Sequence, residues 1–255
     1  MTATHGVDLT VEVETAAHRV APECKVLATI LFVVAVALVP RHGWWAYGVD
    51  ATLVAAVAIA AKAPARLLGQ RLAVEIPFVV FIMLLPFVGG GAKTHLLGVP
   101  LSRAGLQAAG GIAAKATLAV LATALLTATT KPPAILAGLT RLRCPSQLTA
   151  IAGLALRYFQ VVLDELRRMQ IARVARGDDP SWIWQARAAA RSAGALTVRC
   201  LQRGERVYGA MLARGYSGNM PDTVLSERAQ PLEWAVTLVV PLVAATATVL
   251  ARATS

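Results

Sequence analysis

The sequence predicts an all-α, polytopic membrane protein with about five transmembrane helices and a cytosolic coupling region of three helices. Of its 255 residues 56% are hydrophobic and only 15% are charged, whereas a soluble domain carries about 25% charged residues. The mean hydropathy of +0.60 agrees with this imbalance. Several long apolar runs separated by polar connections complete the evidence. We therefore expect a multi-pass protein of the cell membrane rather than a soluble helical core.

Each apolar run predicts one membrane helix. The fourth and fifth runs are long enough to cross a bilayer core alone, whereas the first three need flanking residues to complete a span. Trp44, Trp45 and Tyr47 open the second run and resemble an interfacial aromatic belt. The runs cover residues 26–39, 46–61, 74–88, 106–130 and 232–250.

A basic insertion separates the fourth and fifth runs. Residues 131–228 hold 15 of the 25 basic residues and seven acidic ones, and we find no uninterrupted membrane-length apolar run there. The positive-inside tendency places this insertion and the N-terminus in the cytoplasm and the C-terminus outside. We therefore expect an N-terminal membrane part at 1–130, cytosolic coupling helices at 131–230 and a C-terminal transmembrane helix at 231–255.

Three helices are predicted inside the insertion. A short one follows Pro132-Pro133 to about residue 142, and a long one covers residues 146–176. A third begins with the capped restart Asp179-Pro180-Ser181 and continues toward Arg214. Residues at helical spacings, three or four apart on the first helix and three, four or seven apart on the second, mark one face of each long helix. These faces comprise Tyr158, Val162, Leu166, Met169, Arg173 and Arg176 on the first, and Ala193, Leu196, Cys200, Val207, Met211 and Arg214 on the second.

Both long helices end in the same hexapeptide pattern, Ala-x-x-Ala-Arg-Gly, at residues 172–177 and 210–215. One interpretation is helix capping, because an arginine complements the helix dipole and Gly177 and Gly215 can stop the helices. The other is docking, because small alanines permit close approach and a guanidinium suits carboxylates and carbonyls. Two copies on two cytosolic helices favour a role toward a cytosolic partner.

With these motifs the chain resembles the transmembrane T component of energy-coupling factor (ECF) transporters, the CbiQ/EcfT-like family. The resemblance covers roughly residues 20–250 and departs from the family pattern at Lys115, where we expect arginine. Lysine keeps the charge there but loses the planar fork. Besides the twin Ala-Arg-Gly motifs, the resemblance rests on residues 22–27 (Pro-Glu-Cys-Lys-Val-Leu), 101–106 (Leu-Ser-Arg-Ala-Gly-Leu), 129–133 (Thr-Thr-Lys-Pro-Pro), 156–159 (Leu-Arg-Tyr-Phe) and 210–216.

The resemblance implies a coupling subunit of an ATP-driven importer rather than an enzyme. Two ABC-type ATPase subunits would hydrolyse ATP, and a membrane S component would capture a metal ion, cobalt or nickel, or a vitamin. Arg176 and Arg214 would each engage one ATPase subunit, and no cofactor is implied. The full set of coupling residues is Ala175, Arg176, Gly177, Ala213, Arg214 and Gly215.

Other candidate sites are weaker. Residues 89–94 (Gly-Gly-Gly-Ala-Lys-Thr) lack the glycine spacing of a phosphate-binding loop and are expected to form a flexible loop. The histidines and cysteines show no metal-ligand spacing. Hence we expect no catalytic, cofactor or metal site.

Four charged residues fall in or near the spans. We expect Asp50, Glu75 and Glu233, which lie near run ends, to reach the interface or pair internally. Lys115 lies deeper, and an internal salt bridge or a carbonyl contact is expected there.

A net charge of +11 leaves a second functional class open: a membrane scaffold whose basic helices bind anionic lipid or nucleic acid. The sequence contains no recognised nucleic-acid-binding motif, and the adjacent spans confine the basic region to the bilayer surface. We therefore expect the lipid bilayer, but no nucleic acid, among the partners.

Overall fold

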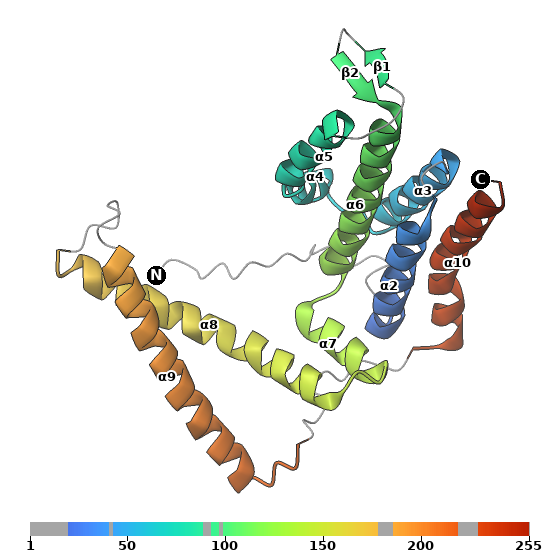
Figure 1. Cartoon of the computed structure of the whole chain (residues 1–255). Helices are drawn as coiled ribbons and strands as arrows, with labels where there is room; N and C mark the ends of the chain where they lie inside the picture. The colour runs from blue at the N-terminus through green and yellow to red at the C-terminus, as the bar shows by residue number, and fades with distance from the viewer. Residues whose placement is uncertain are drawn as a thin grey trace. The chain divides into compact units, whose positions relative to one another are not determined.

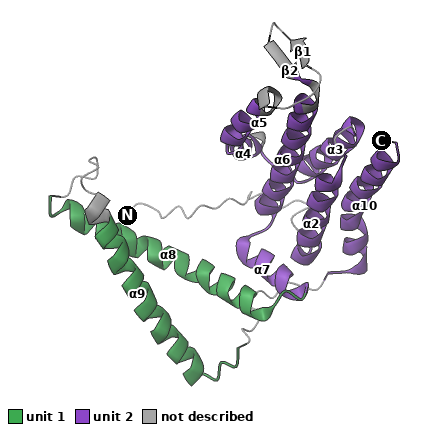
Figure 2. Cartoon of the chain, viewed as in Figure 1, with its two compact units in different colours: residues 1–7, 143–224 green, residues 8–142, 225–255 purple. Residues whose placement is uncertain are grey.

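The computed structural model divides the chain into two compact units (Figures 1 and 2). One unit comprises residues 1–7 and 143–224, and the other comprises residues 8–142 and 225–255. We call them the coupling unit and the membrane unit. The structure describes residues 20–40, 43–88, 93–96, 99–177, 186–218 and 229–254.

The membrane unit is helical, as predicted. All five apolar runs form helices (α2, α3, α5, α6 and α10), and the short helix predicted after Pro132 is α7. The bounds are α2 Pro22–Leu38, α3 Trp44–Ala60, α4 Ala65–Ala73, α5 Ile76–Val88, α6 Arg103–Thr129, α7 Pro132–Arg141 and α10 Pro231–Ala253.

Two elements of this unit were not predicted. Helix α4 lies in the expected loop after the second run, and a β-hairpin precedes α6. Strand β1 (Lys93–Leu96) pairs antiparallel with β2 (Val99–Ser102), with Lys93 opposite Ser102. The loop prediction for residues 89–94 is therefore wrong at Lys93 and Thr94, which lie in β1, while residues 89–92 fall outside the described part.

The coupling unit contains the two predicted long helices, α8 (Ser146–Val174) and α9 (Ala186–Ala213). The expected capped restart at residues 179–181 lies outside the described residues. By length and composition, three described helices could cross a membrane: α6 over Gly105–Thr129, α8 and α10. Helix α8 lies inside the basic insertion and meets the length and composition of a span, although Arg157 interrupts its apolar stretch. However, its mean hydropathy of 1.2 is below the 1.7 of α6 and the 2.0 of α10.

Helix α2 is the centre of the membrane unit and contacts α6, α7 and α10. Its last carbonyl groups have no partner within the helix, so they accept hydrogen bonds from neighbouring helices. Lys115 Nζ of α6 donates to Ala37 O at 2.8 Å, and Arg252 of α10 donates to Leu38 O from Nη2 at 2.9 Å. The carbonyl contact expected for Lys115 is confirmed. Such cations also complement the negative end of the α2 dipole.

The acidic residues near the span ends differ in whether their carboxylates have hydrogen-bond partners. Glu75 Oε2 accepts a hydrogen bond from Thr117 Oγ1 at 3.1 Å, and Glu233 accepts one from Gln230 N at 3.0 Å, in agreement with internal pairing. Asp50 is fully buried, and neither of its carboxylate oxygens has a hydrogen-bond partner among the described residues. The prediction is therefore wrong for Asp50, which lies on the face of α3 that packs into the core, whereas Gly48 and Ala51 beside it are exposed.

Close packing between α7 and α2 depends on Gly138. A Cβ atom at this position would lie 3.0 Å from Glu23 N and 3.1 Å from the carbonyl carbon of Pro22, both of which are backbone atoms. We expect Gly138→Ala to lower the stability of the membrane unit by about 1–3 kcal/mol, as overpacking does elsewhere. The measurement is the apparent unfolding temperature of the detergent-solubilised protein.

Gly48→Ala is the matched control. Gly48 lies in α3, and a Cβ there would meet nothing within 4 Å. Alanine should stabilise that helix by about 0.5–1 kcal/mol because it restricts the unfolded chain. Equal unfolding temperatures for the Gly138 variant and the unaltered protein would contradict the close contact.

Candidate coupling site

Both Ala-Arg-Gly motifs lie at the C-terminal ends of helices. Helix α8 ends at Val174 and α9 ends at Ala213, immediately before or within the motifs. Gly177 has a φ of 84° and Gly215 a φ of 82°, in the left-handed region that favours glycine. The predicted helix stops at both glycines are confirmed.

The two helix ends share a hydrogen-bond pattern. The amide of Gly177 donates to Val174 O at 3.0 Å, and the amide of Gly215 donates to Leu212 O at the same distance. At the second end Tyr216 N also donates to Met211 O at 3.0 Å, which completes a Schellman motif. The residue before each left-handed glycine is an arginine. The two motifs are therefore equivalent in backbone conformation as well as in sequence.

The residues of both Ala-Arg-Gly motifs lie on the surface of the coupling unit. Ala175, Arg176, Gly177 and their counterparts in the second motif are all exposed. Neither the Arg176 nor the Arg214 guanidinium forms a hydrogen bond or ion pair that involves another described residue. Backbone amides cap the helices, so neither arginine side chain is required for capping.

Helices α8 and α9 are joined by a charged bridge, and residues of both helices line an apolar groove beside it. Glu165 of α8 accepts hydrogen bonds from Arg199 of α9 and, at 3.1 Å, from Arg168 of its own helix. Beside this bridge lies a groove with a volume of about 480 Å³. Six residues of the two predicted helix faces line it: Tyr158, Val162, Leu196, Cys200, Val207 and Met211.

Other apolar side chains of these helices are exposed. On α8 the exposed fraction reaches 65% at Ile151 and 69% at Ile171, and on α9 it reaches 64% at Leu201. Within an apolar 18-residue window of α8 only 6% of the residues are buried. Surfaces of this kind commonly mark contact with a protein or a membrane.

Among the described residues no group of three His, Cys, Asp or Glu side chains could hold a metal ion. Cys24, Cys144 and Cys200 are free thiols. The candidate site remains the pair of exposed helix ends.

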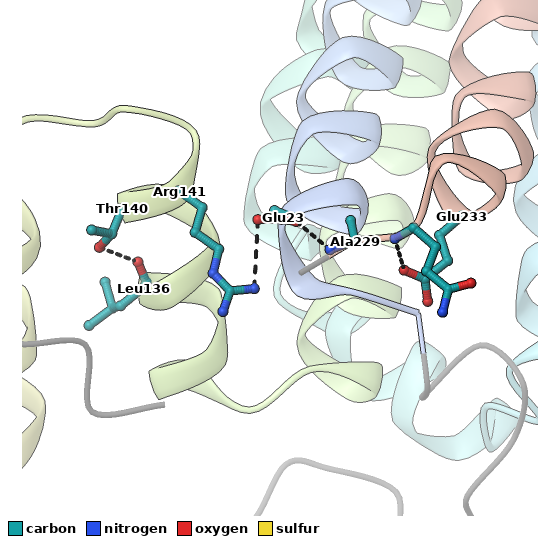
Figure 3. Close-up of polar contacts among 7 residues, drawn as sticks. Glu23, Leu136, Thr140, Arg141, Ala229 and Glu233 are labelled. Carbon is teal, nitrogen blue, oxygen red and sulfur yellow. Dashed lines mark hydrogen bonds and ion pairs between the residues drawn. The ribbon is translucent and has the colours of Figure 1, made fainter. Parts of the chain in front are cut away.

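Glu23, in the first turn of α2, lies in the motif at residues 22–27, but no role for it was predicted from the sequence. This residue is only 7% exposed and connects three segments of the membrane unit (Figure 3). Its Oε1 accepts a hydrogen bond from Ala229 N at 2.9 Å, and its Oε2 lies 3.8 Å from Arg141 Nη1. The only local signal was an acidic residue at a helix N-terminus, which is common for dipole reasons alone.

Comparisons with known proteins agree on one family. A family model described as the cobalt transport protein CbiQ matches residues 14–223. The chain is 26% identical to the energy-coupling factor transporter transmembrane protein EcfT of Listeria innocua, over 79% of this chain and 80% of that protein. It is 25% identical to EcfT of Heliobacterium modesticaldum, over 90% and 91%. It is 30% identical to the cobalt transport protein CbiQ of Rhodobacter capsulatus, over 65% and 70%.

Replacing either capping glycine by alanine should loosen its helix end. A Cβ at Gly177 or Gly215 meets nothing within 4 Å, so the cost comes from the left-handed backbone and amounts to about 1–2 kcal/mol. We expect amide hydrogen exchange at the cap to accelerate roughly 5- to 30-fold. Asparagine should have a smaller effect, because it adopts this conformation more readily.

Gly153→Ala in α8 and Gly209→Ala in α9 serve as controls. Both glycines lie inside helices, and a Cβ at either one would meet nothing within 4 Å. Neither control should accelerate exchange at the caps. Unchanged exchange in the Gly177 and Gly215 variants would show that the caps do not define these helix ends.

Proposed function

The chain belongs to the CbiQ family and is a transmembrane T component of an ECF transporter, and we propose that it transmits ATP-driven motion from two ATPase subunits to a substrate-binding S component. It is a membrane transport component and not an enzyme. The proposed division is a membrane part at 1–130 and 231–255 and a cytoplasmic coupling region at 131–230.

The observation that carries the proposal is the pair of equivalent, exposed helix ends. Two ends with the same Ala-x-x-Ala-Arg-Gly pattern, a left-handed glycine in each and an exposed arginine before it suit two ATPase subunits of similar structure. The guanidinium of Arg176 or Arg214 offers a planar set of donors for carboxylates or helix carbonyls of the partner. Because the caps fix the backbone at these ends, a displacement there is passed into helices of 29 and 28 residues.

The exposed apolar side chains of α8 support contact with the S component. Ile151 and Ile171 would lose contact with water in such an interface. The concentration of basic residues in the insertion supports its cytoplasmic location. The ATPase subunits would thus bind one surface of the coupling region, and the S component would bind another.

We propose that the S component determines which substrate is imported. The related proteins carry two kinds of name: CbiQ is called a cobalt transport protein, and EcfT is named for energy coupling alone. A metal ion, cobalt or nickel, and a vitamin are the two candidate substrate classes. The S component that copurifies with the chain would discriminate between them.

The double substitution Arg176→Ala/Arg214→Ala tests the coupling role. If both side chains are desolvated against ATPase subunits, each truncation should weaken binding by about 2 kcal/mol or more. We expect the ATPase subunits to be absent when the tagged variant is purified from its native membrane. The readout is the ATPase content of the purified complex by mass spectrometry, with ATP hydrolysis as a second measure.

Arg167→Ala/Arg191→Ala is the matched control, because both arginines are exposed on α8 and α9 but lie outside the motifs. This variant should retain its ATPase subunits. Normal assembly and normal uptake by the motif variant would refute the role of the two arginines. An unaltered chain that supports uptake without ATPase subunits would refute the proposed function itself.

A further inference from the structure

We propose that Glu23 is a coupling residue that holds both chain connections of the coupling unit against α2, so that movement of α8 and α9 reaches the membrane unit. The proposal rests on the proposed function, because it assumes that the coupling helices move under ATP. It assigns a role to a residue that lies far from the Ala-Arg-Gly motifs in the sequence. The geometry at the base of α2 carries it.

A single buried carboxylate binds two segments at once (Figure 3). Arg141 is the last residue of α7, and its Nη1 lies 3.8 Å from Glu23 Oε2. Ala229 lies two residues before α10, and its amide donates to Glu23 Oε1 at 2.9 Å. The side chain of Glu23 is 9% exposed and that of Arg141 is 19% exposed, so water screens these contacts little.

The two segments are the connections between the units. Arg141 lies two residues before the coupling unit resumes at residue 143, and Ala229 lies five residues after that unit ends at residue 224. The chain therefore enters and leaves the coupling unit within two and five residues, in sequence, of the two partners of Glu23. Any force that reaches the membrane unit through these two connections arrives at the segments that Glu23 holds.

Contacts close to Glu23 also connect the start of α2 with α7 and fix the start of α10. Gly138 allows α7 to approach the backbone of Glu23 closely. On the other side, Glu233 Oε2 accepts a hydrogen bond from Gln230 N at 3.0 Å, within a capping box that fixes the start of α10 (Figure 3). Displacing either connection therefore pulls on α2, α7 and α10 together.

The carboxylate suits this task because it combines a directional hydrogen bond from the Ala229 amide with an ion pair to Arg141. Hydrogen bonds to an ionised group are shorter and stronger than neutral ones. Losing one partner would leave a buried charge undersatisfied, which opposes separation of α7 from α10. We expect α7 and α10 to stay at a fixed separation while the coupling helices move.

The test measures the α7–α10 separation in the assembled transporter. Spin labels are attached at Pro133 of α7 and Leu232 of α10, both exposed, after the three native cysteines have been replaced by alanine. Distance distributions are recorded by pulsed electron paramagnetic resonance without nucleotide and with ATP trapped by vanadate. The chain without a substitution at Glu23 should give one narrow distribution in both states.

Glu23→Ala should retain its ATPase subunits and ATP hydrolysis but give a broader or shifted α7–α10 distance when ATP is trapped. Glu23→Gln, which keeps an acceptor for the Ala229 amide, and Arg141→Ala should show smaller changes of the same kind. These two variants test the role of Glu23 if the Glu23→Ala protein does not assemble with its partners. Glu75→Ala is the matched control, because Glu75 contacts Thr117 but neither connection.

Narrow, nucleotide-independent distances in every Glu23 and Arg141 variant would overturn the proposal. That result would leave the proposed function intact if the Arg176/Arg214 variant still loses its ATPase subunits. Conversely, an Arg176/Arg214 variant that keeps both its subunits and its uptake would refute the coupling role of those arginines, whatever the distances show.

Discussion

Helix α2 is held by polar contacts at both ends, and the membrane unit is assembled around them. At the first turn, Glu23 binds the end of α7 and the segment before α10. At the last turn, backbone carbonyls accept hydrogen bonds from Lys115 of α6 and Arg252 of α10. In an apolar environment an unpaired carbonyl or carboxylate costs several kcal/mol. These contacts therefore restrict which helices can neighbour α2, whereas apolar packing alone is non-directional and would tolerate sliding.

The coupling unit is constructed on a different principle. Its two long helices bury little of their apolar surface within the unit, and both end in exposed arginines. The caps at Gly177 and Gly215 satisfy carbonyls with backbone amides, so the guanidinium groups are not required there. Capping and docking, which compete as explanations when only the sequence is read, are thus compatible. Glycine turns the chain away from the helix end, and we propose that the exposed arginine before it contacts a partner.

The elements that the sequence predicts well are those with local causes. Apolar runs predict α2, α3, α5, α6 and α10, and proline and glycine positions predict the limits of α7 and α8. Helix α4 and the β-hairpin were missed because they are short and amphipathic or mixed in composition. The twin motif could be found because it is a repeat, but the role of Glu23 could not. Glu23 and Ala229 are 206 positions apart, and nothing in the composition around either residue indicates that they meet.

Asp50 is a second residue whose surroundings could not be predicted from the sequence. Its place near the end of an apolar run predicts access to the interface, yet the rotation of α3 turns its carboxylate into the core, where Tyr47 Oη is likewise buried without a partner among the described residues. A helix face is set by tertiary contacts, and a rotation of about 100° per residue separates a core position from an exposed one. Glu23 differs because two fixed partners compensate its burial. Of the two buried carboxylates among the described residues, Glu23 holds two other segments against α2, whereas Asp50 forms no hydrogen bond to another described residue. We therefore propose Glu23, and not Asp50, as the residue that passes a displacement of one segment to another.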